Sequence, residues 1–216
     1  MTISKGQAWG QPYEDNGTVL VVDSDADLAA AVHGSGNVGS DDLVFSVRSG
    51  EVATSLGFVE PRPIETQTTS VQTMVYPMDL GWVELGQRAD HVEAEYPFVA
   101  HVLGRRSPLS WPEYIVVNAP LVGSLRLGPR AHLNDGLLDV TIGRLPWRQA
   151  IEARRRARTG THLPHPGLKA VRVDRFEFTS KRAIHFTVDG RGRGRWRWAR
   201  TSIVPDAFGL AMPPPA

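Results

Sequence analysis

Short apolar runs separated by turn-forming residues are the dominant pattern along this chain. The runs Val19–Val22 and Tyr114–Val117 are rich in β-branched residues, the composition of buried strands. Residues 184–188 alternate apolar with polar side chains, which is the period of a strand with one buried face. The 21 glycines and 16 prolines supply turns between such runs. The pattern therefore predicts a fold of many short strands.

The first quarter of the chain combines strands with helical segments. After the strand Val19–Val22, the acidic stretch 23–27 precedes the apolar segment 28–32, as expected of a short helix with acidic capping. A second strand is predicted at 43–47, followed by a short helical piece that ends near Leu56. We interpret this order as one βαβ-like unit.

The rest of the chain is predicted to be mostly strand. The expected segments are a strand pair within 71–85 and single strands at 96–103, 171–178, 184–188 and 196–204. The predicted fold class is therefore α+β. It consists of a β-rich, sandwich-like C-terminal domain over residues 69–216 and a small, truncated α/β (βαβ) unit over residues 1–68.

One strong helix signal interrupts these strands at residues 146–160. A proline opens the segment and a glycine closes it, and Trp147, Ala150, Ile151 and Ala157 share one face, as in an amphipathic helix. Arginines crowd its last turns, where the helix dipole favours them. We interpret these arginines as a solvated face rather than as a nucleic-acid site.

The stretch 195–198 alternates arginine with tryptophan, within the last predicted strand. Such a strand can place both tryptophans in the core and both arginines in solvent, which is the interpretation we favour. The alternative is an aromatic and basic surface that stacks on bases or docks at lipid headgroups.

A carboxylate-bearing turn lies at the centre of the predicted C-terminal domain. Asn134, Asp135 and Gly136 are residues that tolerate positive φ, and Asp139 follows four positions after Asp135. An aspartate in a turn usually accepts a hydrogen bond from its own backbone, and this is the first interpretation. Two carboxylates at a strand end could also hold a divalent cation.

These residues carry a resemblance to a known family. Asn118, the stretch 128–131, the stretch 134–140 and Val188-Asp189-Gly190 resemble motifs in the C-terminal domain of the diacylglycerol kinase-like lipid kinases, which include sphingosine and bacterial lipid kinases. The resemblance covers roughly the last half of the chain. It implies a domain that works with ATP and Mg²⁺ to transfer a phosphoryl group to a lipid hydroxyl.

The resemblance also implies roles for individual residues. Asp189 matches the position of the proposed catalytic base, and Asp135 and Asp139 match the position of a metal-linked network. Asn118 and Arg130 belong to the matching motifs and are candidate ligand-binding residues. His132, beside the central turn, could contact a phosphate or cap the turn, and capping is the favoured interpretation.

The nucleotide-binding motifs depart from the family pattern. The stretch 23–27 has aspartates where the family has the glycine-rich phosphate loop Gly-Gly-Asp-Gly-Thr, whose function needs closely spaced backbone N–H groups. In the second nucleotide loop, 49–57, only Ala53, Leu56 and Gly57 fit well. Arg191 replaces the glutamate that usually follows Asp-Gly. These departures argue against ATP binding and turnover.

Three functions remain open from the sequence. The favoured one is a non-catalytic relative that binds a lipid, a small ligand or a protein partner through the sandwich domain. The second is a divergent ATP- and Mg-dependent lipid kinase. The third is a scaffold that forms homo-oligomers through a sheet edge.

Composition limits the partners and the compartment. Lys and Arg total 24 and Asp and Glu total 23, so a net charge of +1 gives no global attraction to nucleic acid, and a membrane surface is a minor candidate. The chain has no cysteine, so neither a disulfide framework nor thiolate chemistry is expected. No long apolar segment suggests export or a membrane span, and we therefore expect a cytoplasmic protein.

Overall fold

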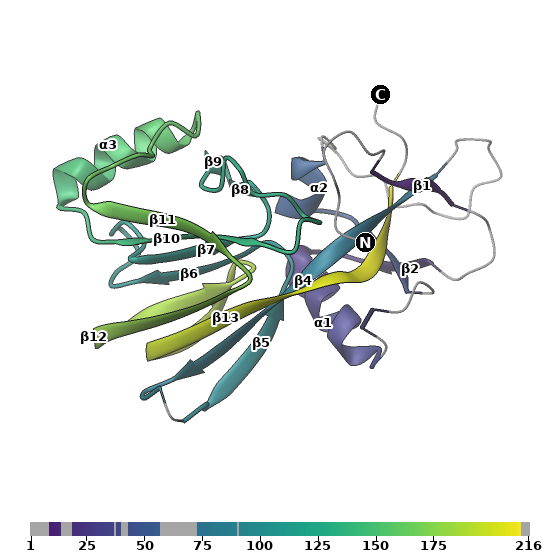
Figure 1. Ribbon diagram of the computed structural model, residues 1–216, viewed down its shortest axis with the longest axis horizontal. Coiled ribbons are helices and arrows are strands. Elements are labelled where there is room, and N and C mark those ends of the chain that lie inside the picture. Colours follow the sequence, from purple (N-terminus) through teal and green to yellow (C-terminus); the bar gives the residue numbers. More distant parts are fainter. Residues whose placement is uncertain are drawn as a thin grey trace.

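The computed structural model describes residues 9–13, 19–36, 38–39, 43–56, 73–89 and 91–212. Strands dominate these residues, and three helices lie around a curved, branching sheet (Figure 1). The predicted α+β class with a sandwich-like C-terminal part is confirmed. Among the described residues, no helix is long and apolar enough to cross a membrane.

The elements follow one another in an order close to the predicted one. The helices are α1 (Asp25–Gly34), α2 (Glu51–Ser55) and α3 (Trp147–Ala157). The strands are β1 (Gln11–Pro12), β2 (Val19–Val22), β3 (Val44–Val47), β4 (Met74–Gly86), β5 (Ala94–Phe98), β6 (His101–Arg105), β7 (Tyr114–Val117), β8 (Leu121–Val122), β9 (Leu125–Arg126), β10 (Leu138–Gly143), β11 (Leu168–Val173), β12 (Arg175–Val188) and β13 (Arg191–Met212).

Two long strands, β4 and β13, hold the two parts of the molecule together. They pair antiparallel from Trp198↔Gly86 to Met212↔Met74, and Figure 1 shows them running from the sandwich to the N-terminal part. The main path through the sheet is β1-β4-β13-β12-β6-β7-β10-β11, and β5 pairs with β4. The sheet bends back on itself so that its inner faces enclose a core.

The N-terminal βαβ unit is confirmed and is joined to the same sheet. Strands β2 and β3 pair in parallel, and β3 pairs in parallel with β13 at Gly209↔Val44. Leu28 of α1, Phe45 of β3 and Phe208 of β13 belong to one buried cluster. This unit therefore shares a core with the sandwich, whereas the predicted boundary near residue 68 falls in 57–72, outside the described residues.

The core of the sandwich gathers side chains from both of its layers. Val83, Phe98, Leu138 and Ile184 are fully buried in this second cluster. Tyr114 stacks on Phe178 with 4.8 Å between ring centroids, and its hydroxyl lies 2.8 Å from that of Thr201. Because each buried aromatic side chain removes a large apolar area from water, this cluster supplies much of the stability of the sandwich.

Three predicted strand boundaries are wrong for reasons outside the local pattern. The segment 71–85 forms, in its described part, one long strand rather than a pair, because β13 supplies its partner along the whole length. The strand expected at 96–103 divides into β5 and β6 at Val99 and Ala100, whose N–H groups bind a distant side chain. The strand expected at 171–178 divides at Asp174, where the chain passes from β11 to β12.

The predicted helix at 146–160 is confirmed as α3, but its buried face differs from the predicted one. Ala153 and Ala157 are buried, whereas Trp147 and Ile151 are exposed. The small alanines allow the helix to approach the sheet closely and to join a cluster with Trp111. The two largest apolar side chains of the helix consequently face outward.

The alternating stretch 195–198 follows the favoured interpretation. Trp198 is buried, Trp196 packs against the sandwich core, and Arg195 and Arg197 are exposed. The indole N–H of Trp198 donates to Glu177 at 2.9 Å, so burial does not leave this donor without an acceptor.

A buried carboxylate holds the central turn against the two long strands. Asp79 of β4 accepts the backbone N–H of Gly136 at 2.7 Å and that of Asp206 at 3.0 Å. Its side chain is buried, and this burial raises the pKa of Asp79 to about 7 although the bond from Gly136 opposes the shift. Asp206 has a φ of +50° at the irregularity between Val204 and Phe208, so Asp79 also stabilises that bulge.

Replacement of Asp79 by alanine is therefore expected to be strongly destabilising. Two backbone N–H groups would lose a buried acceptor, at about 1–3 kcal/mol each. The expected loss is about 2–6 kcal/mol in the free energy of unfolding, measured by urea denaturation. Asp174→Ala is the matched control, since Asp174 is exposed and no hydrogen bond to its side chain is described. Equal stability of the two variants would contradict this role for Asp79.

Candidate functional site

Asp189 lies in the two-residue turn that joins β12 to β13. Val188 pairs with Arg191, and Asp189 and Gly190 adopt φ values of +44° and +76°. Two consecutive residues with positive φ define a type I′ hairpin turn, for which Asp-Gly is a preferred sequence. The local sequence therefore fixes the backbone that presents the Asp189 side chain.

The carboxylate of Asp189 binds three consecutive backbone N–H groups at the corner between β5 and β6. Val99 donates to Oδ2 at 2.9 Å, and Ala100 and His101 donate to Oδ1 at 3.0 and 2.8 Å. Burial raises the pKa of Asp189, while the nearby His101 and the three N–H groups oppose that shift. The interaction attaches the hairpin firmly to the rest of the sandwich.

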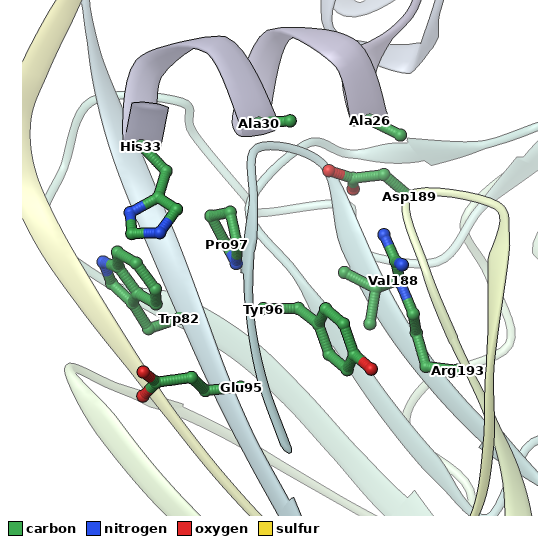
Figure 2. A pocket seen from close by; sticks show the side chains of 10 residues that line it. All are labelled: Ala26, Ala30, His33, Trp82, Glu95, Tyr96, Pro97, Val188, Asp189 and Arg193. Atoms are coloured by element: carbon green, nitrogen blue, oxygen red, sulfur yellow. The ribbon is translucent and has the colours of Figure 1, made fainter. Parts of the chain in front are cut away.

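A small cavity of about 230 Å³ lies beside Asp189, between α1 and the sandwich. Figure 2 shows Ala26, Ala30 and His33 of α1 above it. The other walls are formed by β4, β5 and the hairpin, with Trp82, Glu95, Tyr96, Pro97, Val188, Asp189 and Arg193. Acidic and basic side chains both line this cavity.

Arg193 forms the polar wall opposite α1. Its guanidinium carbon lies 4.2 Å from the centroid of the Tyr96 ring, a cation–π contact. Figure 2 shows the Arg193 side chain extending past Val188 towards Asp189. Arg191, on the same hairpin, forms an ion pair with Asp27 of α1 at 2.5 Å. The residue that departs from the family pattern thus links the hairpin to the start of α1.

Protein carboxylates occupy the N-terminal end of α1, where the resemblance would place nucleotide phosphates. The hydroxyl of Ser24 accepts the N–H of Asp27 as the N-cap. Asp25 is buried, and its Oδ2 accepts the N–H of Glu51, the first residue of α2, at 2.6 Å. The carboxylates of Asp27 and Glu51, whose pKa values are lowered, carry negative charge here and repel a phosphate where a glycine loop would attract it.

Gly50 makes room for this arrangement. Its φ is +144°, and a Cβ there would collide with the Asp25 carboxylate. Both observations require glycine. Gly50 belongs to the stretch 49–57, but the sequence alone did not reveal its steric role, because Asp25 is distant in the chain.

Asp25 and Glu51 form a coupled pair of carboxyl groups. Burial, a hydrogen bond with the Glu51 side chain and the charge of Asp189 raise the pKa of Asp25 to about 9. Burial alone would raise the pKa of Glu51, but the hydrogen bond from Asp25 lowers it. We infer that Asp25 carries the shared proton at neutral pH and donates it to Glu51.

The structure brings Asp135 and Asp139 together on a shared arginine. The Arg172 guanidinium forms an ion pair with Asp135, and its Nε lies 3.1 Å from Oδ1 of Asp139. Asp135 also accepts the N–H of Leu137 at 3.0 Å, which confirms the predicted bond to its own turn. Within the described residues, no three Asp, Glu or His side chains are grouped to hold a metal ion. The metal role of the two aspartates stays a prediction.

Sequence reasoning missed Arg172 because β11 meets β10 only in the folded sheet. The register Asp139↔Arg172 places the two side chains opposite each other on neighbouring strands. The arginine supplies the positive charge that the sequence interpretation assigned to a cation. If residues 138–143 and 168–173 had been paired as antiparallel strands, the position of Arg172 opposite Asp139 would have indicated the ion pair.

The three predicted ligand-binding residues have different surroundings. Asn118 is buried and donates to the carbonyls of Val99 at 3.0 Å and Asp79 at 3.3 Å, which is a structural role. His132 accepts the N–H of Asn134 at 3.2 Å, so it caps the turn as favoured. Arg130 lines a second cavity, of about 680 Å³, on the face of β10 and β11 that carries Asp139.

The pH dependence of folding provides a test of the Asp25–Glu51 pair. The folded-state pKa of Asp25, about 9, lies above its ordinary value of 3.8, so the native state holds a proton that the unfolded chain releases. Its stabilising contribution is therefore complete below about pH 4 and is lost as pH rises towards 9. The pKa of Glu51 is lowered from its ordinary value of 4.5, so the loss of stability towards pH 9 is assigned to Asp25.

Asp25→Asn is expected to flatten this dependence. Asparagine keeps an acceptor for the Glu51 N–H and a donor for the Glu51 carboxylate, but it does not titrate. Thermal melts between about pH 5 and pH 9 should show a smaller decrease in Tm for Asp25→Asn than for the wild type. Parallel profiles for the two proteins would contradict the shared proton.

Comparison with known proteins agrees with this architecture. Residues 68–212 match the family described as "YegS C-terminal NAD kinase beta sandwich-like domain". None of the proteins with curated descriptions matches the sequence.

Solved structures of similar fold come from Bacillus anthracis str. Sterne. A putative diacylglycerol kinase from that organism has a TM-score of 0.53 and 11% identity, over 89% of this chain and 77% of that one. A second structure of such a kinase has a TM-score of 0.50 and 13% identity, over 91% and 78% of the two chains. At this identity, the structures show a shared fold only. The family match spans most of the chain, which therefore belongs to the family of the YegS C-terminal, NAD kinase beta sandwich-like domain.

Proposed function

We propose that this protein is a non-catalytic member of its family that binds a lipid or lipid-like ligand in the larger cavity of the sandwich. The observation that carries the proposal is the combination of an apolar cavity with a buried, unpartnered carboxylate oxygen. At about 680 Å³, the cavity falls in the range of about 300–1,000 Å³ that is usual for small-molecule sites.

The walls of this cavity are mainly apolar. They are formed by Leu127, Pro129, Val140, Leu163, Pro164, Pro166, Leu168 and Ala170. Such walls favour a hydrocarbon chain, because its transfer from water is favourable in proportion to the apolar area removed from solvent.

Two polar groups in the cavity define the other end of the ligand. Among the described residues, Oδ2 of Asp139 has no hydrogen-bond partner, although Oδ1 faces Arg172. A ligand hydroxyl could donate to this oxygen and so satisfy a buried acceptor. Arg130 could donate to a ligand oxygen. A glycerol-headed amphiphile offers both groups together with an apolar chain.

The start of α1 supports the non-catalytic part of the proposal. Phosphoryl transfer depends on groups that position and neutralise the phosphates of ATP. Here Asp25, Asp27 and Glu51 gather at that helix end, and Arg191 is already paired with Asp27. This acidic set of side chains does not suit the negatively charged phosphates of a nucleoside triphosphate.

A divergent ATP- and Mg-dependent lipid kinase is the alternative. It is favoured by Asp189, a buried aspartate of raised pKa beside a cavity, since a general base needs such a perturbed environment. In this alternative, the lipid hydroxyl would enter the smaller cavity next to Asp189. The two functions therefore place the ligand in different cavities.

Blocking each cavity separately tests the proposal. Ala170→Phe should fill the larger cavity, and Ala30→Phe should fill the smaller one as a matched control, because both alanines are exposed wall residues. We expect wild type and Ala30→Phe to bind 1-lauroylglycerol equally in calorimetric titrations below its critical micelle concentration. Ala170→Phe should weaken binding by about tenfold or more.

The opposite outcomes are equally clear. Binding that is lost in Ala30→Phe and retained in Ala170→Phe would assign the ligand to the Asp189 cavity and favour the kinase alternative. Absence of binding to the wild type would reject a glycerol-headed ligand for the larger cavity.

A further inference from the structure

The outward face of α3 carries two large apolar side chains. Trp147 is 68% exposed and Ile151 is 60% exposed. They are four residues apart and therefore neighbours on one side of the helix. Ala153 and Ala157 contact the sandwich from the other side. The helix thus has a small-residue face that packs and a larger apolar face that does not.

Arginines surround this exposed apolar pair. Helical spacing places Arg148, Arg155 and Arg158 on the same side as Trp147 and Ile151, and all three are exposed. The guanidinium of Arg148 lies 5.2 Å from the centroid of the Trp147 ring. Glu152 is the only acidic residue within α3, and it pairs with Arg155 at 3.0 Å. The face is therefore strongly positive although the whole chain has a net charge of only +1.

We propose that this face of α3 docks on the surface of an anionic lipid bilayer. Trp147 and Ile151 would enter the headgroup region, and the flanking arginines would contact lipid phosphates. Helices that lie in a bilayer interface combine Trp and aliphatic residues on one face with basic residues beside them. Tryptophan in particular favours this interface, because its ring is apolar and its N–H is polar.

Charge complementarity favours a bilayer over other occupants. A second copy of this chain would bring the same arginines towards each other, which is repulsive. A nucleic acid would pair with the arginines but would leave Ile151 without an apolar contact. An anionic bilayer offers phosphates and hydrocarbon at adjacent depths, which matches both kinds of side chain.

The position of α3 in the fold allows such contact. Figure 1 shows α3 at one extremity of the molecule, above β10 and β11 and far from α1. The chain that follows α3 contributes residues 163–166 to the larger sandwich cavity. Docking would bring this cavity close to the membrane surface. The inference stands on the exposure and charge of α3 and does not rest on the proposed ligand.

Vesicle sedimentation with the full chain tests the inference. We expect binding to sucrose-loaded vesicles of phosphatidylcholine with about one quarter phosphatidylglycerol, and at least about tenfold weaker binding to pure phosphatidylcholine. Trp147→Ser combined with Ile151→Ser should weaken binding to the anionic vesicles by about tenfold or more. Arg148→Glu combined with Arg158→Glu should weaken it at least as much, and raised salt should weaken binding of the wild type.

A matched variant separates this face from general charge effects. Lys181→Glu combined with Arg182→Glu makes the same change in net charge on exposed residues of β12. We expect it to bind anionic vesicles within about twofold of the wild type. All the substituted side chains are exposed, so unchanged Tm values should show that every variant is folded.

Several results would overturn the inference. They are absence of binding to anionic vesicles, equal binding to neutral and anionic vesicles, and equal loss in the β12 control. Unchanged binding by the Trp147→Ser, Ile151→Ser variant would do so too. The wild type could instead fail to bind vesicles and elute as a dimer in size-exclusion chromatography. If the Trp147→Ser, Ile151→Ser variant then elutes as a monomer, this face binds a second copy of the chain.

Discussion

Buried carboxylates that accept backbone N–H groups from distant segments are the constraint on which this structure depends. Asp25 binds the start of α2, Asp79 binds the central turn and the β13 bulge, and Asp189 binds the corner between β5 and β6. A buried carboxylate is costly unless its oxygens are satisfied, so each partner segment has little freedom to move. Hydrophobic burial supplies the driving force for folding, and these aspartates fix the relative positions of the loops that form the candidate site.

The same interactions show that membership in a family does not imply the phosphate binding that a glycine loop provides. The chain shares the sandwich of its family, and at Asp189 and the central turn it has the residues that carry the resemblance. At the start of α1, however, the buried Asp25 carboxyl already binds the N–H of Glu51, whereas phosphate binding would need open N–H groups. A fold hosts functions only through its sites. The apolar cavity near Arg130 therefore favours ligand binding over phosphoryl transfer as the function of this chain.

Local pattern predicted the elements well and their long-range partners poorly. The strand Val19–Val22, the helix at 146–160 and the Asp135 turn all follow from nearby residues, and the structure has each of them. The strand break at Val99 was not predictable, because its cause is the side chain of Asp189, ninety residues later. The ion pair with Arg172 was missed for a similar reason. The outward direction of Trp147 depends on which side of α3 can approach Trp111, which only packing decides.

Calorimetric titration of the wild-type protein with Mg-ATP tests the central claim most directly. The claim is that protein carboxylates occupy the N-terminal end of α1, where the family resemblance would place the phosphates of a nucleotide. It predicts no saturable heat up to millimolar nucleotide, and no nucleotide-dependent rise in Tm, because only a ligand of the native state shifts the folding equilibrium. Saturable binding of one Mg-ATP per chain, abolished by Asp189→Ala in a variant that remains folded, would contradict the claim and establish the kinase alternative as the better account.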